Sequence, residues 1–170
     1  MLLPEPIKGG PKELIKYVKE NPQCAEAWYY LGLFRFREER DIPGAKEAFK
    51  KAISCKKEYP DAHIAFADCL WAEMQKEEAI ALLGKALEIL PEASIIHWRL
   101  GSFLRCKEEL EKSAEHFKKA LKLEKNDKET EKIREELKMI MDKIKIKRCP
   151  YCDHDIGLDK NFCQNPDCLR

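Results

Sequence analysis

The sequence repeats itself at a fixed step of 34 positions. Three sets of residues keep this step: Phe49, Leu83 and Phe117; Ala52, Ala86 and Ala120; and Ala45, Ala79 and Ser113. Two packed helices need such a pattern, because a small residue lets the backbones approach and a large one fills the space between them. A period of this length is typical of a solenoid, in which each unit buries its apolar face against the next. We therefore predict an all-α chain, an α-solenoid of helix-turn-helix repeats.

The period divides the central part of the chain into three units, residues 25–59, 60–93 and 94–127. The first helix of each unit carries a large residue followed by a small one: Leu31-Gly32, Phe66-Ala67 and Leu100-Gly101. The first unit is one residue longer than the others, and we expect the extra residue in the turn around Arg40–Gly44.

The first unit contains Trp28-x-x-Leu31-Gly32, followed by Ala45-x-x-x-Phe49 and Ala52. This pattern resembles the tetratricopeptide repeat, and the second unit adds that family's closing proline. The departures are His63 and His97 in the place of Trp28, Arg35 in the place of a tyrosine, and Lys57 and Lys125 in the place of a closing proline. The resemblance implies a superhelix of helix pairs whose concave face binds another protein.

Helical segments are also expected on both sides of the repeats. Residues 12–24 keep the phase of a second helix and its closing proline, which predicts an N-terminal capping half-repeat after an arm of residues 1–11. Residues 128–147 carry one apolar stripe on a charged helix, formed by Ile133, Leu137, Ile140 and Ile144. We interpret this helix as a C-terminal cap, because the last repeat would otherwise expose an apolar face. The nearly heptad spacing leaves a coiled-coil or dimer seam open as the alternative, with a monomer favoured.

The resemblance also implies which residues line the concave face. The candidate partner-binding residues are Tyr29, Leu33 and Phe36 in the first unit, Ile64, Asp68 and Trp71 in the second, and Trp98, Ser102 and Arg105 in the third. Aromatic side chains and arginine often supply most of the energy of a protein interface, so a partner peptide or helix is expected in this groove. The alternative is that some of these residues, such as Phe36 and Trp98, pack against neighbouring repeats or the capping helix.

One class of partner is disfavoured by the sequence. Members of this family that hold chaperone tails bind a terminal carboxylate with Lys and Asn residues. The matching positions here carry Tyr29, Leu33, Ala65 and Ile95, and Arg99 is the one cation among them. Because a carboxylate buried there would lack paired donors, an apolar or mixed peptide is the better fit.

Four cysteines gather at the C-terminal end of the chain: Cys149, Cys152, Cys163 and Cys168. Their spacing is Cys-x2-Cys, then ten intervening positions, then Cys-x4-Cys, which can bring four thiolates to one tetrahedral Zn²⁺. The segment resembles the short zinc ribbons appended to many prokaryotic proteins, although its second pair is two residues wider than usual. We therefore predict a zinc ribbon at residues 148–170 with one structural Zn²⁺; iron is the alternative for four thiolates.

The charge balance and the absence of known motifs exclude several functions. The chain has 32 Lys and Arg against 31 Asp and Glu, which argues against a generally cationic nucleic-acid binder. The sequence shows no apolar run long enough for a membrane span, no signal peptide, no phosphate loop and no nucleophile or zinc-protease motif. We expect a cytoplasmic, non-enzymatic scaffold that binds a partner protein. The alternative is a nucleic-acid- or ribosome-associated adaptor that uses the ribbon and the basic neck formed by Lys143, Lys145, Lys147 and Arg148.

Overall fold

The computed structural model of this chain describes residues 11–147. Within this range it contains eight α-helices, one π-helix and no strand, so the all-α prediction is confirmed there. The predicted zinc ribbon, and all but the last residue of the predicted N-terminal arm, lie outside the described residues. In chain order the elements are α1 (Pro11–Glu20), α2 (Ala25–Phe34), η2 (Arg35–Glu39), α3 (Ile42–Cys55), α4 (Pro60–Ala72), α5 (Lys76–Ile89), α6 (Ser94–Cys106), α7 (Leu110–Leu123) and α8 (Asp127–Lys147).

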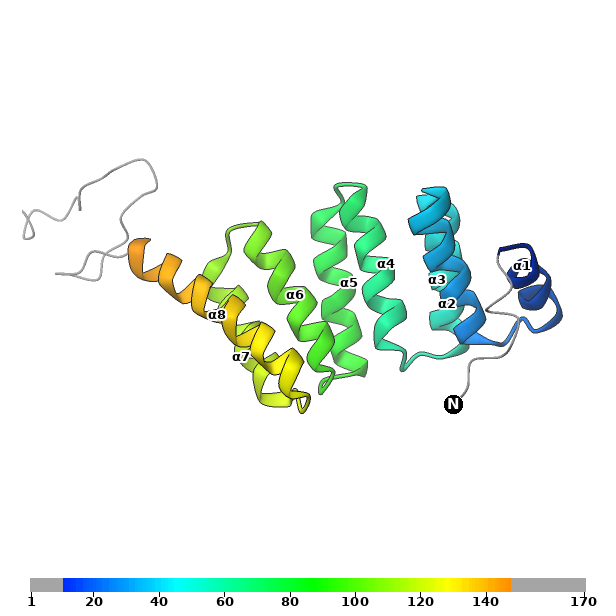
Figure 1. The fold of residues 1–170 in the computed structure, drawn as a ribbon. Coiled ribbons are helices and arrows are strands. Elements are labelled where there is room, and N and C mark those ends of the chain that lie inside the picture. Colours follow the sequence, from blue (N-terminus) through cyan, green and yellow to red (C-terminus); the bar gives the residue numbers. More distant parts are fainter. Residues whose placement is uncertain (1–10, 148–170) are drawn as a thin grey trace, which may run out of the picture. The chain divides into compact units, whose positions relative to one another are not determined.

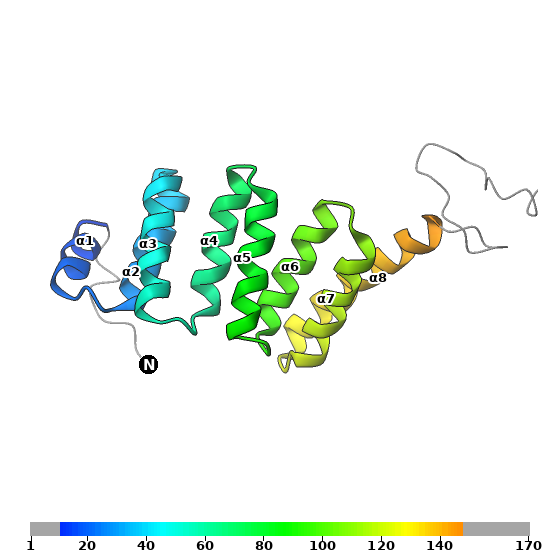
Figure 2. The same cartoon turned by 180° about the vertical axis from the view of Figure 1, so that it is seen from behind.

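The helices form two compact units, each larger than a single repeat; from here on, the first unit is the part that ends at Ile96 and the second unit is the part that begins at His97. In the first unit each helix packs against the next along the chain, from α1 to α5. The two views of the ribbon show α2 beside α3 and α4 beside α5 (Figures 1 and 2). In the second unit α7 packs against α8. Short turns between neighbouring helices therefore make the helix-turn-helix pairs that the period predicted.

Local sequence explains where several of these helices begin. The Asp41 carboxylate accepts a hydrogen bond from the backbone N–H of Gly44 at 3.0 Å and so caps α3. A proline stands in the first turn of α3, and Pro60 opens α4. Proline suits the first helical turn because the N–H group that it lacks would have no partner inside the helix. An N-cap carboxylate satisfies one of the N–H groups that the helix leaves unpaired.

The small-large pairs of the repeat meet as the period predicted. An added Cβ on Gly32 would lie 2.5 Å from Cε1 of Phe49, and one on Gly101 would lie 3.1 Å from Cδ2 of Phe117. Both phenylalanine side chains are almost fully buried. In the second unit the Ser113 hydroxyl also donates to the carbonyl of Gly101 at 2.7 Å, so that a buried hydrogen bond joins α6 to α7. These contacts fix the register of the first helix of each of these two repeats on the second.

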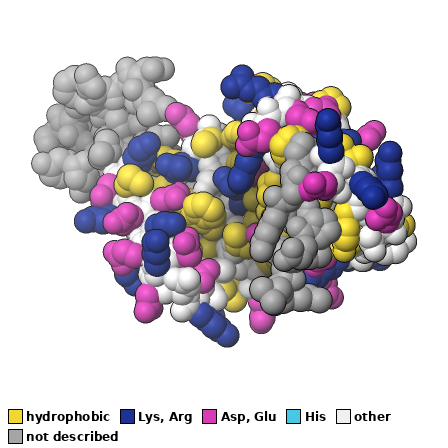
Figure 3. Space-filling view, turned by 45° about the vertical axis from the view of Figure 1, so that its right-hand side comes forward, with side chains coloured by type: hydrophobic (Ala, Val, Ile, Leu, Met, Phe, Trp, Pro, Cys, Tyr) yellow, Lys and Arg dark blue, Asp and Glu magenta, His cyan; other side chains and the backbone are white. Residues whose placement is uncertain are grey.

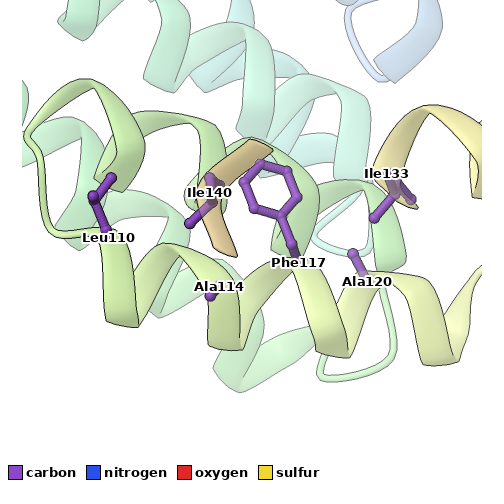
Figure 4. Close-up of a cluster of buried hydrophobic side chains, with 6 residues drawn as sticks. All are labelled: Leu110, Ala114, Phe117, Ala120, Ile133 and Ile140. Carbon is purple, nitrogen blue, oxygen red and sulfur yellow. The ribbon is translucent and has the colours of Figure 1, made fainter. Parts of the chain in front are cut away.

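The predicted apolar stripe of α8 packs on α7. Ile133 and Ile140 are buried against a cluster on α7, and Leu137 and Ile144 lie at its edge half-buried. Figure 4 shows the buried side chains of this cluster between the two helices: Leu110, Ala114, Phe117, Ala120, Ile133 and Ile140. The stripe therefore covers the last repeat, as a capping helix should.

The extra residue of the first repeat lies in the π-helix η2, one turn earlier than we predicted. The turns after the first helices of the three repeats each contain one non-glycine residue with positive φ, namely Arg40, Met74 and Glu108. These residues are 34 positions apart, so the turns keep the period and contain no insertion. A π-helix adds one residue within a helix, which accounts for the longer first repeat. The predicted position in the turn around Arg40–Gly44 is therefore wrong, because the extra residue is accommodated inside the helix.

A histidine takes over a structural role of tryptophan in the second repeat. The indole Nε1–H of Trp28 donates to the carbonyl of Pro22 at 2.8 Å, six residues earlier in the chain. Nε2 of His63 lies 2.9 Å from the carbonyl of Lys57, also six residues earlier. A carbonyl oxygen can only accept, so Nε2 of His63 carries the ring proton. The substitution thus keeps the hydrogen bond that ties each first helix to the turn before it.

Candidate partner-binding site

The predicted groove residues of α2 contribute to packing and to the surface at once. Tyr29, Leu33 and Phe36 are each half-buried. They lie against a buried cluster formed by Ala45 and Phe49 of α3 and Cys69 of α4. Part of each side chain therefore closes the core between repeats, and the rest is available to a partner.

The predicted groove residues of α4 share one face of that helix. Asp61, Ile64, Asp68 and Trp71 follow one another at steps of three, four and three residues, which places them on one side. Ile64 is buried and belongs to the core, whereas Asp68 and Trp71 are half-buried and Asp61 is exposed. The ammonium group of Lys76 lies 5.6 Å from the centre of the Trp71 ring.

Tyr29 joins the surface of α2 to that of α4. Its ring centre lies 5.2 Å from that of Tyr59, which precedes α4, in a tilted pair. Burial raises the pKa of the Tyr29 hydroxyl, and the negative charges of Asp61 and Asp68 raise this pKa further, whereas Arg37 lowers it. These three charges thus lie close enough to Tyr29 to act on it. We call the surface formed by Tyr29, Leu33, Asp61, Asp68 and Trp71 the α2/α4 face.

Two of the groove residues predicted in the third repeat, Trp98 and Arg105, contact Glu136 of α8. The indole Nε1–H of Trp98 donates to Oε1 of Glu136 on α8 at 3.2 Å. Nη2 of Arg105 lies 3.7 Å from Oε2 of the same carboxylate, an ion pair too long for a hydrogen bond. The Trp98 ring also packs, half-buried, against the α7–α8 cluster. The hydroxyl of Ser102 donates to the carbonyl of Trp98 at 3.1 Å within α6. Trp98 therefore packs against the capping helix, which was the alternative for this residue.

Two histidines that no sequence pattern pairs lie side by side in the second unit. Nδ1 of His97 is 3.0 Å from Nδ1 of His116, and the ring centres are 5.3 Å apart. One ring must donate and the other accept, so the pair shares a single proton between these atoms. Burial and the neighbouring His97 lower the pKa of His116 to about 4, and Lys119 adds to the effect. The His116 ring is therefore uncharged at neutral pH.

The described residues hold no candidate metal site and no membrane helix. Nowhere in residues 11–147 do three or more metal-binding side chains gather. The four cysteines predicted to bind zinc, Cys149, Cys152, Cys163 and Cys168, lie outside that range. None of the helices described here is both long enough and apolar enough to cross a membrane.

Comparison with known proteins supports the repeat. Residues 36–100 match the family model of the tetratricopeptide repeat. No curated protein matches the chain. The match covers the second repeat completely and parts of its neighbours.

Several solved structures share the fold at low sequence identity. MamA residues 41 to the end, from Desulfovibrio magneticus RS-1, is 20% identical with a TM-score of 0.61, over 81% of this chain and 75% of that one. Yeast Tom70 is 15% identical with a TM-score of 0.70, over 82% of this chain and 30% of that one. The first tetratricopeptide-repeat domain of Spaghetti (RPAP3), bound to the HSP90 peptide SRMEEVD, is 18% identical with a TM-score of 0.60, over 72% of this chain and 94% of that one. At this identity the likeness shows the fold, a solenoid of tetratricopeptide type.

Proposed function

Because residues 36–100 match the tetratricopeptide repeat, we propose that this chain is a protein-interaction scaffold that binds a peptide or helix of a partner protein. The observation that carries the proposal is the α2/α4 face of the first unit. There, Tyr29 of α2 lies near Asp61 and Asp68 of α4, and Trp71 follows on the same side of α4. Aromatic rings suit such a surface because they bury much area and lose little conformational freedom.

The two units differ in what they offer a partner. Trp98 and Arg105 of the second unit are already in contact with Glu136 of α8, so a partner would compete with that carboxylate for them. Tyr29 and Trp71 keep part of their surface exposed in the first unit. We therefore place the centre of partner binding on the first unit.

The charges of the α2/α4 face bear on the kind of peptide. Asp61 and Asp68 lie near Tyr29, and Arg37 is the cation that acts on the same hydroxyl. The terminal carboxylate of a chaperone tail would meet these two carboxylates and would be repelled. A mixed apolar peptide is the better fit, in contrast to the acidic peptide that the Spaghetti domain holds.

Removing one indole tests the proposal. Trp71→Ala should remove at least about 2 kcal/mol of partner binding, as at a hot spot, and leave the circular dichroism spectrum and the melting temperature nearly unchanged. Ile89→Ala is the control, because it removes a large exposed apolar side chain (46% exposed) from α5, a helix of the first unit that contributes no residue to the face. Proteins retained by the wild type and by Ile89→Ala, but not by Trp71→Ala, are the expected partners. Equal retention by all three chains would refute the assignment of the face.

We also propose that Cys149, Cys152, Cys163 and Cys168 hold one structural Zn²⁺. The donor set supports this, since four thiolates complete a tetrahedral shell and leave no open position for catalysis. So short a segment buries too little apolar surface to fold by itself, and zinc binding can supply the missing free energy. Serine substitution of any one of the four cysteines should abolish stoichiometric zinc in elemental analysis. Retention of the metal in all four variants would exclude this site.

A further inference from the structure

One feature that the proposed function does not use is a pocket of about 240 Å³ in the first unit, where α1, α2 and α3 meet. The side of this unit that carries α1 comes forward in Figure 3, where hydrophobic side chains (yellow) lie among charged ones. Ile15 and Val18 of α1 and Trp28 and Leu31 of α2 supply apolar walls. The pocket is therefore a separate surface from the α2/α4 face, because α1, η2 and α3 line it together with α2 and no residue of α4 does.

The charges at this pocket are unequal. Three cations line it, Lys19 from α1, Arg35 from η2 and Lys51 from α3, against the single carboxylate of Glu47. The ammonium group of Lys51 lies 4.2 Å from the centre of the Trp28 ring, within the range of a cation–π contact. The helices α1, η2 and α3 thus contribute one positive charge each to the pocket.

Two of the lining groups are held in place by the fold. Nη1 of Arg35 donates to the carbonyl of Gly44 at 3.1 Å, and no other partner of this guanidinium occurs among the described residues. A guanidinium has five N–H donors, so most of them are available to an anion. The indole of Trp28 is anchored through Nε1–H to the carbonyl of Pro22 at 2.8 Å. A ligand would therefore meet a ring and a cation that are already oriented.

The volume limits the size of the occupant. Sites for cofactors and drug-sized ligands usually measure about 300–1,000 Å³, and this pocket is smaller. It suits one or two side chains of a peptide better than a whole cofactor. An apolar side chain matches the walls formed by Ile15, Val18 and Trp28, and an acidic side chain beside it matches the excess of cations.

We propose that this pocket is a second docking site, which binds an acidic side chain flanked by an apolar one on a segment of a partner protein. The acidic group pairs with Arg35 and Lys51, and the apolar group lies against Trp28. The α2/α4 face has two carboxylates, Asp61 and Asp68, near Tyr29 and would repel an acidic side chain, so the two surfaces select different segments. The proposal does not depend on binding at the α2/α4 face.

Nuclear magnetic resonance can test the site with a defined probe. The probe is the blocked tripeptide acetyl-Leu-Glu-Leu-amide, and its matched controls replace Glu by Gln, which keeps the shape, or by Lys, which reverses the charge. The readout is the set of three indole N–H signals, assigned with the Trp28→Phe, Trp71→Phe and Trp98→Phe variants. We expect a saturable shift of the Trp28 signal, with the Glu peptide binding about tenfold more tightly than the Gln peptide, as charge-assisted hydrogen bonds allow.

Neighbouring lysines of α3 provide the control in the protein. Lys51→Met keeps the apolar stem and removes the charge, and it should bring the affinity for the Glu peptide down to that for the Gln peptide. Lys50→Met removes the same charge one residue away, where the lysine lies over Phe66 instead, and it should change the affinity less than twofold at physiological salt. Glu47→Gln should strengthen binding of the Glu peptide.

Four results with the peptides and the variants would overturn the proposal, and one with a small carboxylate would do so as well. They are no binding of the Glu peptide up to about 10 mM, equal affinities for the Glu and Gln peptides, a shift confined to Trp71 or Trp98, and an equal loss in the Lys50→Met and Lys51→Met variants. Hexanoate that bound as tightly as the Glu peptide would assign the pocket to small carboxylates and would overturn the assignment to a protein segment.

Discussion

The glycines of the repeat offer a graded test of its packing. A Cβ added at Gly32 would lie 2.5, 2.7 and 2.9 Å from three ring atoms of Phe49. The Phe49 side chain is 1% exposed, so it has little room to move. At Gly101 the equivalent contact with Phe117 is 3.1 Å, and at Gly84 of α5 the added atom would meet nothing within 4 Å.

These distances decide the sign of each glycine-to-alanine change. Alanine is favoured over glycine inside a helix by about 0.5–1 kcal/mol, which acts alike at all three positions. Overpacking a filled core costs about 1–3 kcal/mol. We therefore expect Gly84→Ala to raise the free energy of unfolding by about 0.5–1 kcal/mol. Gly101→Ala should leave it near its original value. Gly32→Ala should lower it by roughly 1 kcal/mol or somewhat more, because the overpacking there exceeds the gain in helix propensity.

Urea unfolding followed by circular dichroism measures these differences. Because units of a solenoid can unfold separately, hydrogen exchange of the amides in α2 and α3 should accompany it as the local measurement. Faster exchange in α2 and α3 is expected for Gly32→Ala alone. If Gly32→Ala stabilised the chain as much as Gly84→Ala, the close packing of α2 on Phe49 would be wrong.

Three further predictions concern the second unit and the C-terminal segment. Trp98→Phe keeps the ring but removes the donor to Glu136, so it should lower the free energy of unfolding by about 1 kcal/mol in urea titrations, and no loss would show that this hydrogen bond is not formed. The pKa of His116 lies at about 4 in the folded chain, below its ordinary value near 6.5, so the unfolded chain takes up a proton first as the pH falls. Stability should therefore be full above about pH 6.5 and should drop by about 1–2 kcal/mol, a value reduced for the partial exposure of this ring, by pH 4; His116→Gln should remove this part of the pH dependence. Purified chain should contain one zinc, and its chelation should leave most of the helical signal intact, because the described helices pack without it.

The 34-residue period predicted the fold because residues one or more periods apart make the same packing contacts in their own repeats. Phe49 and Phe117 stand two periods apart, and each was found against the glycine of its own repeat. The stripe of α8 predicted which side of that helix is buried, because apolar residues at helical spacing lie on one face. Sequence reasoning therefore sufficed for the helices and for their apolar faces.

The polar contacts between separate helices could not be predicted from the sequence. His97 and His116 are 19 positions apart, and the repeat pattern specifies neither residue as a histidine. A stripe of apolar residues says nothing about Glu136, which lies beside it and engages Trp98. For this reason the sequence did not indicate the polar contacts that Glu136 makes with Trp98 and Arg105 of the third repeat.

The π-helix η2 has a consequence for how such a chain can diversify. Counting back three residues from the turn positions Arg40, Met74 and Glu108 gives Arg37, Trp71 and Arg105 as equivalents. Counted instead from Gly32, whose equivalents are Ala67 and Gly101, the equivalent of Trp71 and Arg105 is Phe36. One additional residue within a single helix thus changes which side chain stands at this position, an aromatic ring or a cation, while the turn that follows and the next helix stay in phase. In an array of near-identical repeats, a change in length can alter recognition without any amino acid being substituted.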